Sequence, residues 1–205
     1  MKPPFPHDRP LSWSQLSSFR YRPSAWYARY VLGEESPTSK EMLFGKEIGE
    51  RLASDPTYLP EVPRLPIFEH ELKFEFNGLS MIGYIDAWCP ETKRLYEYKT
   101  SRNKKAWTQQ TVNDHGQLRM YAMGLYLTEK IKPEDIYFSL YWIPTHIVEG
   151  EVALVEPVEI SSFKTKITTA DILRFGQEIL DTRKAMMDYY ENYVSDEMSE
   201  DEFFA

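Results

Sequence analysis

The most regular alternation of apolar and charged residues lies at positions 67–76. In the segment IFEHELKFEF, phenylalanine and leucine alternate with glutamate and lysine, which is the period-two pattern of a half-buried strand. Asn77 and Gly78 follow directly, and this dipeptide is typical of a two-residue hairpin turn. The pattern therefore predicts a hairpin of two strands, at 67–76 and 79–88, with a third strand at 94–100 after a second turn.

Capping residues and helix-type spacing predict helices on both sides of these strands. Four prolines between positions 55 and 66 indicate a loop, and the apolar run at 136–143 predicts a fourth strand, with 147–155 as its possible partner. The expected helices cover 12–19, 23–31, 39–54, 107–130 and 169–193. The order α-α-β-β-β-α-β-(β)-α predicts an α/β fold, a mixed β-sheet flanked by helices.

Length and composition indicate one globular domain. We expect a flexible N-terminus at 1–11, a single folded domain at 12–193 and an acidic, disordered tail at 194–205. Hydrophobic residues make up 42% of the 205 residues, which is enough for a core. The sequence shows no membrane-spanning run and no signal peptide, and a single cysteine favours the cytoplasm, of a cell or of a phage-infected host.

The negative charge of the chain is concentrated at its C-terminal end. The chain has 24 basic and 32 acidic side chains, and residues 191–205 hold six of the acids and no base. The body is therefore close to neutral, which leaves a local basic patch open as a binding surface.

The hairpin registers place several carboxylates together. A loop at Asn77–Gly78 sets Asp86 opposite Glu69, and a loop at Glu91–Thr92 sets Asp86 opposite Glu97. One face of the sheet would then be charged and the other apolar; the expected charged face carries Glu69, Glu71, Asp86, Glu97 and Lys99, and the expected apolar face carries Phe68, Leu72, Phe74, Phe76, Met81, Ile85 and Tyr98. A hard divalent cation would relieve the repulsion between Asp86 and Glu97. For Glu69 and Glu71, the better interpretation is that they lie on a solvent-exposed face of the sheet.

The order of short motifs resembles that of the PD-(D/E)XK nucleases. Gly83-Tyr84-Ile85-Asp86 and Glu97-Tyr98-Lys99 match a G-x-[IL]-D…E-x-K pattern, and Gln117 with Tyr121 matches the Q-x-x-x-Y motif of the RecB-type exonuclease branch. The resemblance covers roughly residues 11–145. It implies a restriction-endonuclease-like core and hydrolysis of DNA phosphodiester bonds with Mg²⁺ or Mn²⁺, by an exonuclease of recombination, repair or phage DNA metabolism.

The resemblance also implies roles for single residues. Asp86 and Glu97 would hold the metal together with the carbonyl of Tyr98, and Lys99 would orient the attacking water or stabilise negative charge. Gln117 and Tyr121 would contact the nucleic-acid backbone, although Tyr121 fits the apolar stripe of its helix equally well. The basic segment that follows would contact phosphates, or else form a plain solvated loop; its residues are Arg102, Lys104 and Lys105.

Two departures from the family pattern concern the metal. Gly49 stands where the family often has a histidine ligand, so that Glu50 or Glu47 would have to substitute; the alternative is that both are surface glutamates. Relatives with an iron–sulfur cluster use four cysteines, and this chain has only Cys89, so we expect no cluster.

Other functions stay open on the sequence alone. The second hypothesis is a catalytically weak nuclease-fold module that binds nucleic acid or a protein partner, and the third is a site-specific endonuclease. The sequence has no phosphate-binding loop, so a helicase or recombination protein would be a separate partner. An oligomer also stays open, and His115, two residues before Gln117, is a further candidate for the site.

Overall fold

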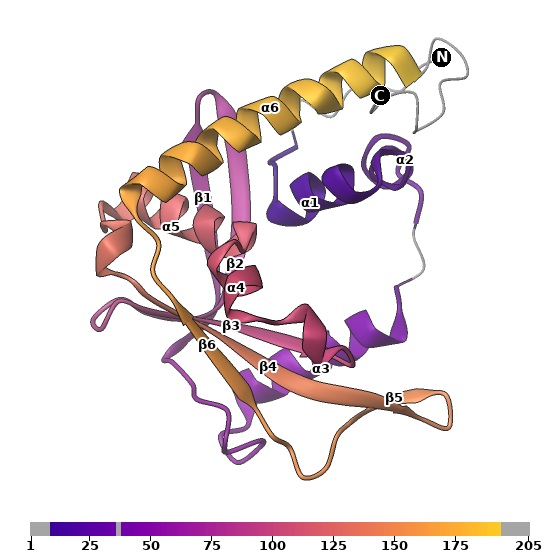
Figure 1. The fold of residues 1–205 in the computed structure, drawn as a ribbon, viewed down its shortest axis with the longest axis vertical. Helices are drawn as coiled ribbons and strands as arrows, with labels where there is room; N and C mark the ends of the chain where they lie inside the picture. The colour runs from indigo at the N-terminus through magenta and orange to yellow at the C-terminus, as the bar shows by residue number, and fades with distance from the viewer. Residues whose placement is uncertain (1–8, 36–37, 194–205) are drawn as a thin grey trace.

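The computed structural model describes residues 9–35 and 38–193, and these form a mixed six-stranded sheet flanked by helices (Figure 1). This is the predicted class of fold. The predictions for residues 1–8 and 194–205 lie outside the described residues. Within the described part of the chain, no helix is both long enough and apolar enough to cross a membrane.

The sheet combines antiparallel hairpins with one parallel pair. Its strands are β1 (Ile67–Phe76), β2 (Leu79–Cys89), β3 (Arg94–Ser101), β4 (Tyr137–Val148), β5 (Glu151–Leu154) and β6 (Ser161–Thr165). The order is β1-β2-β3-β4-β5, and β6 also pairs with β4. Among the described strands, only β3 and β4 pair in parallel, which requires a crossover, and the helices between them provide it. The sequence did not reveal β6.

Both predicted hairpin registers are confirmed. Phe76 pairs with Leu79 at the first turn, where Asn77 and Gly78 adopt the positive φ angles of 48° and 75° that such a turn requires. In the second hairpin the pairing of Ala87 with Tyr96 has the predicted offset.

The helices cover the sheet from two sides. They are α1 (Trp13–Tyr21), α2 (Pro23–Trp26), α3 (Lys40–Ser54), α4 (Gln109–Asn113), α5 (Gly116–Glu129) and α6 (Thr169–Tyr193), with short turns η1 (Tyr27–Val31), η2 (Lys104–Ala106) and η3 (Pro133–Asp135). Ser12 and Ser39 cap α1 and α3 through their side chains. Figure 1 shows α6 lying across α1 and α5 on one side of the sheet, with α3 on the other.

The single helix predicted at 107–130 is wrong, because the chain breaks between α4 and α5. His115 has an extended backbone, and α5 begins at Gly116. A Cβ atom at Gly116 would lie only 2.1 Å from the ring of Trp13, so the indole of α1 occupies the space that a side chain would need. The apolar spacing on both sides of the break is helical, and it therefore hides the interruption.

The predicted division of the sheet into one charged and one apolar face is also wrong. Ile85 and Trp88 both pack into the main core, although residues three apart on a regular strand face opposite sides. Phe68 and Tyr98 belong instead to the clusters beside α3. The change of face coincides with Glu69, which has a φ of 49° in the middle of β1. Glu97 consequently lies inside the molecule rather than on a solvated face.

The N-terminal boundary of the folded part lies before Ser12. Leu11, which we expected in the flexible segment, is buried and forms a parallel bridge with Met81. Its N–H donates to the carbonyl of Ser80 and its carbonyl accepts from Ile82, both at 2.8 Å. These two bonds attach the start of α1 to β2.

Two glycines allow a matched test of this packing. We expect Gly116→Ala to lower the free energy of unfolding by about 1–3 kcal/mol, because the new methyl group overlaps the Trp13 ring. Gly49→Ala, inside α3 with no heavy atom within 4 Å of its Cβ, is expected to raise it by about 0.5–1 kcal/mol. Urea unfolding of both variants measures the difference, and equal stabilities would contradict this packing.

Candidate active site

Strands β2 and β3 bring the three predicted catalytic residues together. The backbone N–H of Tyr98 donates to Asp86 Oδ2 at 2.7 Å, so that the carboxylate reaches across to the neighbouring strand. Lys99 Nζ lies 2.5 Å from Glu97 Oε1. The β2–β3 ladder ends at the Ala87–Tyr96 pair, directly before this point, and the strands part to make room for the carboxylates.

Glu97 is a buried carboxyl group with too few partners. Its exposed fraction is 0%; Oε1 contacts the Lys99 amine, and Oε2 accepts no hydrogen bond from any described residue. Burial raises the pKa of Glu97 to about 8, and the negative charge of Asp86 adds to the rise, while the contact with Lys99 opposes it. The site therefore holds an acceptor that a cation or a proton would satisfy.

Asp86 and Lys99 each shift the pKa of the other. Burial raises the pKa of Asp86, against the opposing effects of Lys99 and the Tyr98 N–H. Burial alone would lower the pKa of Lys99, but attraction to Glu97 and Asp86 outweighs it and raises the pKa. Lys99 therefore carries its positive charge. Among the described residues, it is the cation whose charge lowers the pKa values of both Asp86 and Glu97.

A chain of hydrogen bonds connects Lys99 to α5. Lys99 Nζ donates to Gln117 Oε1 at 3.0 Å, and Gln117 Nε2 donates to the hydroxyl of Tyr121 at 2.6 Å. The Tyr121 hydroxyl donates to the carbonyl of Tyr84 on β2. Tyr121 is only 1% exposed, so its ring is part of the core and it holds Gln117 in place. The packing alternative for Tyr121 is therefore the one that the structure favours.

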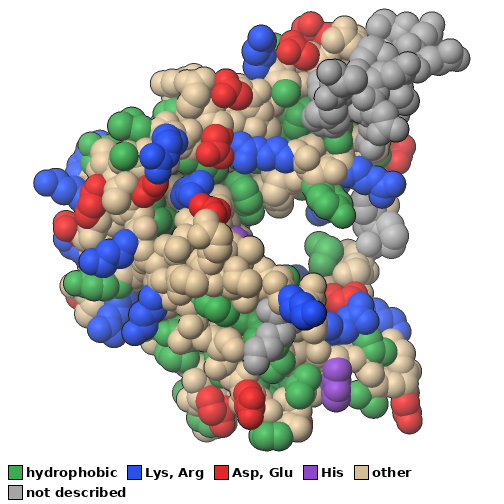
Figure 2. Space-filling model, viewed as in Figure 1, with side chains coloured by type: hydrophobic (Ala, Val, Ile, Leu, Met, Phe, Trp, Pro, Cys, Tyr) green, Lys and Arg blue, Asp and Glu red, His purple; other side chains and the backbone are tan. Residues whose placement is uncertain are grey.

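The site opens into a cleft with two lobes, and Lys99 borders both. One hollow of about 620 Å³ lies between α1, β2 and α5, and the other, of about 270 Å³, lies between α3 and β3. Figure 2 shows the molecule hollowed between the part that contains α1 and α6 and the part that contains α3 and β5. The side chain of Lys99, which is 28% exposed, is thus accessible to a substrate from solvent.

The side chains of the other predicted site residues contact partners outside the group formed by Asp86, Glu97 and Lys99, or are exposed. The ring of Tyr98 packs away from it, against Phe68, and its hydroxyl donates to the carbonyl of Pro63. Glu50 is exposed on α3 and pairs with Lys46 at 3.7 Å. Arg102 pairs with Glu41, which borders the smaller hollow. Lys105 is exposed, and the side chain of Lys104 lies outside the described residues.

Glu69 lies near Asp86, as the predicted hairpin register places it. Burial raises the pKa of Glu69, and the negative charges of Asp86 and Glu50 raise it further. Glu69 in turn contributes to the raised pKa of Glu97. In the alternating pattern of the strand, Glu69 occupies an ordinary solvated position. The pattern does not predict its positive φ angle.

His115 also lies beside the site, as its sequence position allowed. It sits between the rings of Trp13 and Trp107, with centroids 6.3 and 5.5 Å away. Burial lowers the pKa of His115 to about 4, and the charge of Lys99 adds to the effect. This histidine is therefore neutral at pH 7, and Trp13 is a cleft residue that the sequence did not single out.

The donor set fits a hard divalent cation with mostly non-protein ligands. No group of three or more His, Cys, Asp or Glu side chains within the described residues is arranged to hold a metal. Mg²⁺ commonly takes only one or two carboxylates, and water or phosphate oxygens complete its shell. Asp86 and Glu97, whose Oε2 has no partner, meet this requirement.

Comparison with solved structures identifies the fold. A candidate exonuclease from Eubacterium rectale matches with a TM-score of 0.57 and 10% identity, over 89% of this chain and 81% of that chain. A phage-related exonuclease from Haemophilus somnus matches with a TM-score of 0.52 and 15% identity, over 88% and 82%. The chain has the restriction-endonuclease-like fold.

At these identities the likeness is one of fold. No protein-family model matches the chain, and no curated protein matches it by sequence. The assignment of a function therefore depends on the geometry of the site.

The raised pKa of Glu97 predicts a pH-dependent stability. Burial raises the pKa of Glu97 from its ordinary value of 4.5 to about 8, so that between these pH values the folded protein binds a proton on this group that the unfolded chain releases. The metal-free protein should therefore lose stability through this group as the pH rises from 4.5 to 8, by on the order of 1.4 kcal/mol for each pKa unit. Glu97→Gln should remove this loss.

Urea unfolding in EDTA at pH 5, 6, 7 and 8 measures the effect. The difference in stability between Glu97→Gln and the wild type isolates Glu97 from the other titrating groups, and it should grow in favour of the variant as the pH rises. A difference that is constant with pH would contradict the raised pKa.

Proposed function

We propose that this protein is a metal-dependent nuclease of the PD-(D/E)XK type, in the RecB-like branch, that hydrolyses phosphodiester bonds of DNA. The observation that carries the proposal is the buried Glu97, whose Oε1 contacts the Lys99 amine at 2.5 Å and whose Oε2 has no hydrogen-bond partner, beside a second carboxylate, Asp86. A structural ion pair on a sheet would not require a second carboxylate next to it, because the repulsion costs stability.

Asp86, Glu97 and the carbonyl of Tyr98 would hold Mg²⁺ or Mn²⁺ in this mechanism. The bound ion would lower the pKa of a water and neutralise a non-bridging phosphate oxygen. Lys99 would orient the attacking water and stabilise the negative charge that develops on the phosphate. Gln117 fixes the Lys99 amine through its amide oxygen, at 3.0 Å.

The cleft supports an extended polyanionic substrate. Lys99 lies where the two hollows meet, so that a strand crossing the cleft would pass its amine. Arg102 and Lys105 follow β3 and would contact phosphates on the α3 side. The names of the two structural neighbours favour an exonuclease over a site-specific endonuclease.

Lys99→Ala tests the proposal directly. We expect it to lower the rate of cleavage of end-labelled DNA by about 10²–10³-fold, because the charge on the reacting phosphate loses its stabilising cation. Single- and double-stranded DNA would be tested with Mg²⁺, with Mn²⁺ and with EDTA. Lys93→Ala, an exposed lysine paired with Asp135, is the matched control and should cleave like the wild type. Cleavage that persists in EDTA or in Lys99→Ala would refute this mechanism.

A second function is favoured by one observation. Gly49 supplies no ligand, and Glu50 is exposed and paired with Lys46, so the α3 side adds no buried carboxylate to the site. A nuclease-fold module that binds nucleic acid or a protein without cleaving is therefore the alternative to an active enzyme.

Gly49→His distinguishes these functions. Gly49 lies one turn after Gly45, whose Cβ position is 2.9 Å from Thr100 Oγ1, so this helix face is directed at β3. Space around Gly49 is open, and we expect the histidine to tighten Mn²⁺ binding severalfold in calorimetry, with Gly49→Ala unchanged. Cleavage that appears only in Gly49→His would favour the binding module; equal Mn²⁺ affinity in all three proteins would exclude α3 from the site.

A further inference from the structure

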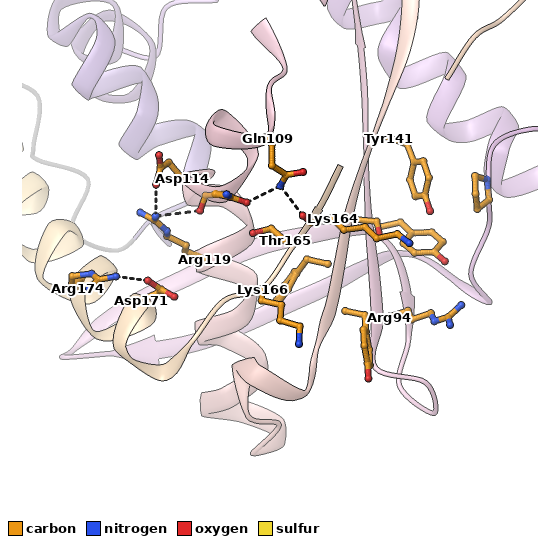
Figure 3. Close-up of a pocket in the computed structure, with 16 residues that line it drawn as sticks. Arg94, Gln109, Asp114, Arg119, Tyr141, Lys164, Thr165, Lys166, Asp171 and Arg174 are labelled. Carbon is orange, nitrogen blue, oxygen red and sulfur yellow. Dashed lines mark hydrogen bonds and ion pairs between the residues drawn. The ribbon is translucent and has the colours of Figure 1, made fainter. Parts of the chain in front are cut away.

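A third hollow, of about 870 Å³, lies away from the cleft and shares no residue with the candidate active site. It is larger than either lobe of the cleft, and strands β3, β4 and β6 form part of its wall together with α4, α5 and α6 (Figure 3). Five basic and two acidic side chains line it. In a chain with a net charge of −8, such a concentration of positive charge points to an anionic ligand.

The two halves of this hollow differ in their charge balance. On the side of the helices, Arg119 pairs with Asp114 at 3.0 Å and Arg174 pairs with Asp171. Figure 3 shows these pairs apart from the remaining cations. Those cations form no ion pair with any described residue; they are Arg94, Lys164 and Lys166.

The strand registers set Arg94 and Lys164 on either side of a row of aromatic rings, and Lys166 follows directly after β6. Tyr96, Ser139 and Lys164 are paired in one row across β3, β4 and β6. Arg94 pairs with Tyr137 in the next row on the same face. Neighbouring strands are about 4.8 Å apart, so the cations of β3 and β6 flank a strip of roughly 10 Å.

The aromatic strip has a buried floor and one open ring. Tyr96 and Tyr141 pack edge to face with centroids 5.0 Å apart, and each is only 8% exposed. Tyr137 is 62% exposed, which leaves its ring available for stacking. An exposed ring on a sheet, flanked by unpaired cations, is the arrangement with which proteins bind single-stranded nucleic acid through its bases and phosphates.

We propose that this sheet face binds a segment of single-stranded nucleic acid outside the cleft. A base stacks on Tyr137, and the phosphates lie against Lys164, Lys166 and Arg94. The inference rests on the proposed function for the class of its ligand, and its test is made without cleavage. The surface would hold a part of the substrate strand that is remote from the scissile bond.

The test measures binding of a fluorescein-labelled dT oligonucleotide by anisotropy, in EDTA, as a function of salt. Tyr137→Ala should raise the Kd at least about fivefold, and Tyr137→Phe should retain wild-type affinity. The double variant Lys164→Gln and Lys166→Gln should reduce the slope of log Kd against log salt by about 1.4, near 0.7 for each phosphate contact. The matched control replaces two exposed lysines outside the hollow, Lys130 and Lys184, by Gln.

The outcomes separate this inference from the proposed function. If Tyr137→Ala and the Lys164/Lys166 variant bind like the control, or if the wild type binds no oligonucleotide, the inference is overturned. The inference is likewise overturned if an acidic peptide binds this surface and does not displace a bound oligonucleotide. A higher Kd in Tyr137→Ala together with a smaller salt slope in the Lys164/Lys166 variant supports the inference. This holds even if the wild type cleaves no DNA with Mg²⁺ or Mn²⁺, because absence of cleavage counts against the proposed nuclease activity alone.

Discussion

The contact between Lys99 and Glu97 is the constraint on which the site depends. A carboxyl group with 0% exposure beside a second carboxylate is costly in a medium of low dielectric constant, and within the described part of the chain the ammonium of Lys99 is the cation that offsets this cost. The surrounding fold serves to keep this cation in place. Gln117 of α5 binds its amine, Tyr121 holds Gln117, and the carbonyl of Tyr84 anchors Tyr121 on the strand that bears Asp86.

This closed loop of contacts links the site to the architecture of the sheet. The parallel pairing of β3 with β4 demands a crossover, and α5 lies within that crossover, packed against β1 and β2, from where its Gln117 reaches Lys99 of β3. The change of face at Glu69 allows Asp86 to approach Glu97 on the inside of the sheet.

The sequence predicted the elements and registers well where local chemistry decides them. The Asn77–Gly78 turn, the serine caps and the period-two strands depend on neighbours in the chain, and they determine which residues oppose Asp86. The failures come from contacts between distant segments. The Trp13 ring that interrupts the helix at Gly116, and the burial of Glu97, depend on packing partners that no local pattern specifies. Motif order brought Asp86, Glu97 and Lys99 together as candidate site residues, whereas the place of Trp13 in the cleft required coordinates.

The central claim is that Asp86 and Glu97 together form a binding site for a divalent cation. Titration of the metal-free protein with Mn²⁺, followed by electron paramagnetic resonance of the free ion, tests this without any substrate. The account predicts saturable binding by the wild type and its loss in Asp86→Asn, while Asp135→Asn, an exposed aspartate outside the site, binds as the wild type does. Equal Mn²⁺ binding by the wild type and Asp86→Asn would contradict the claim.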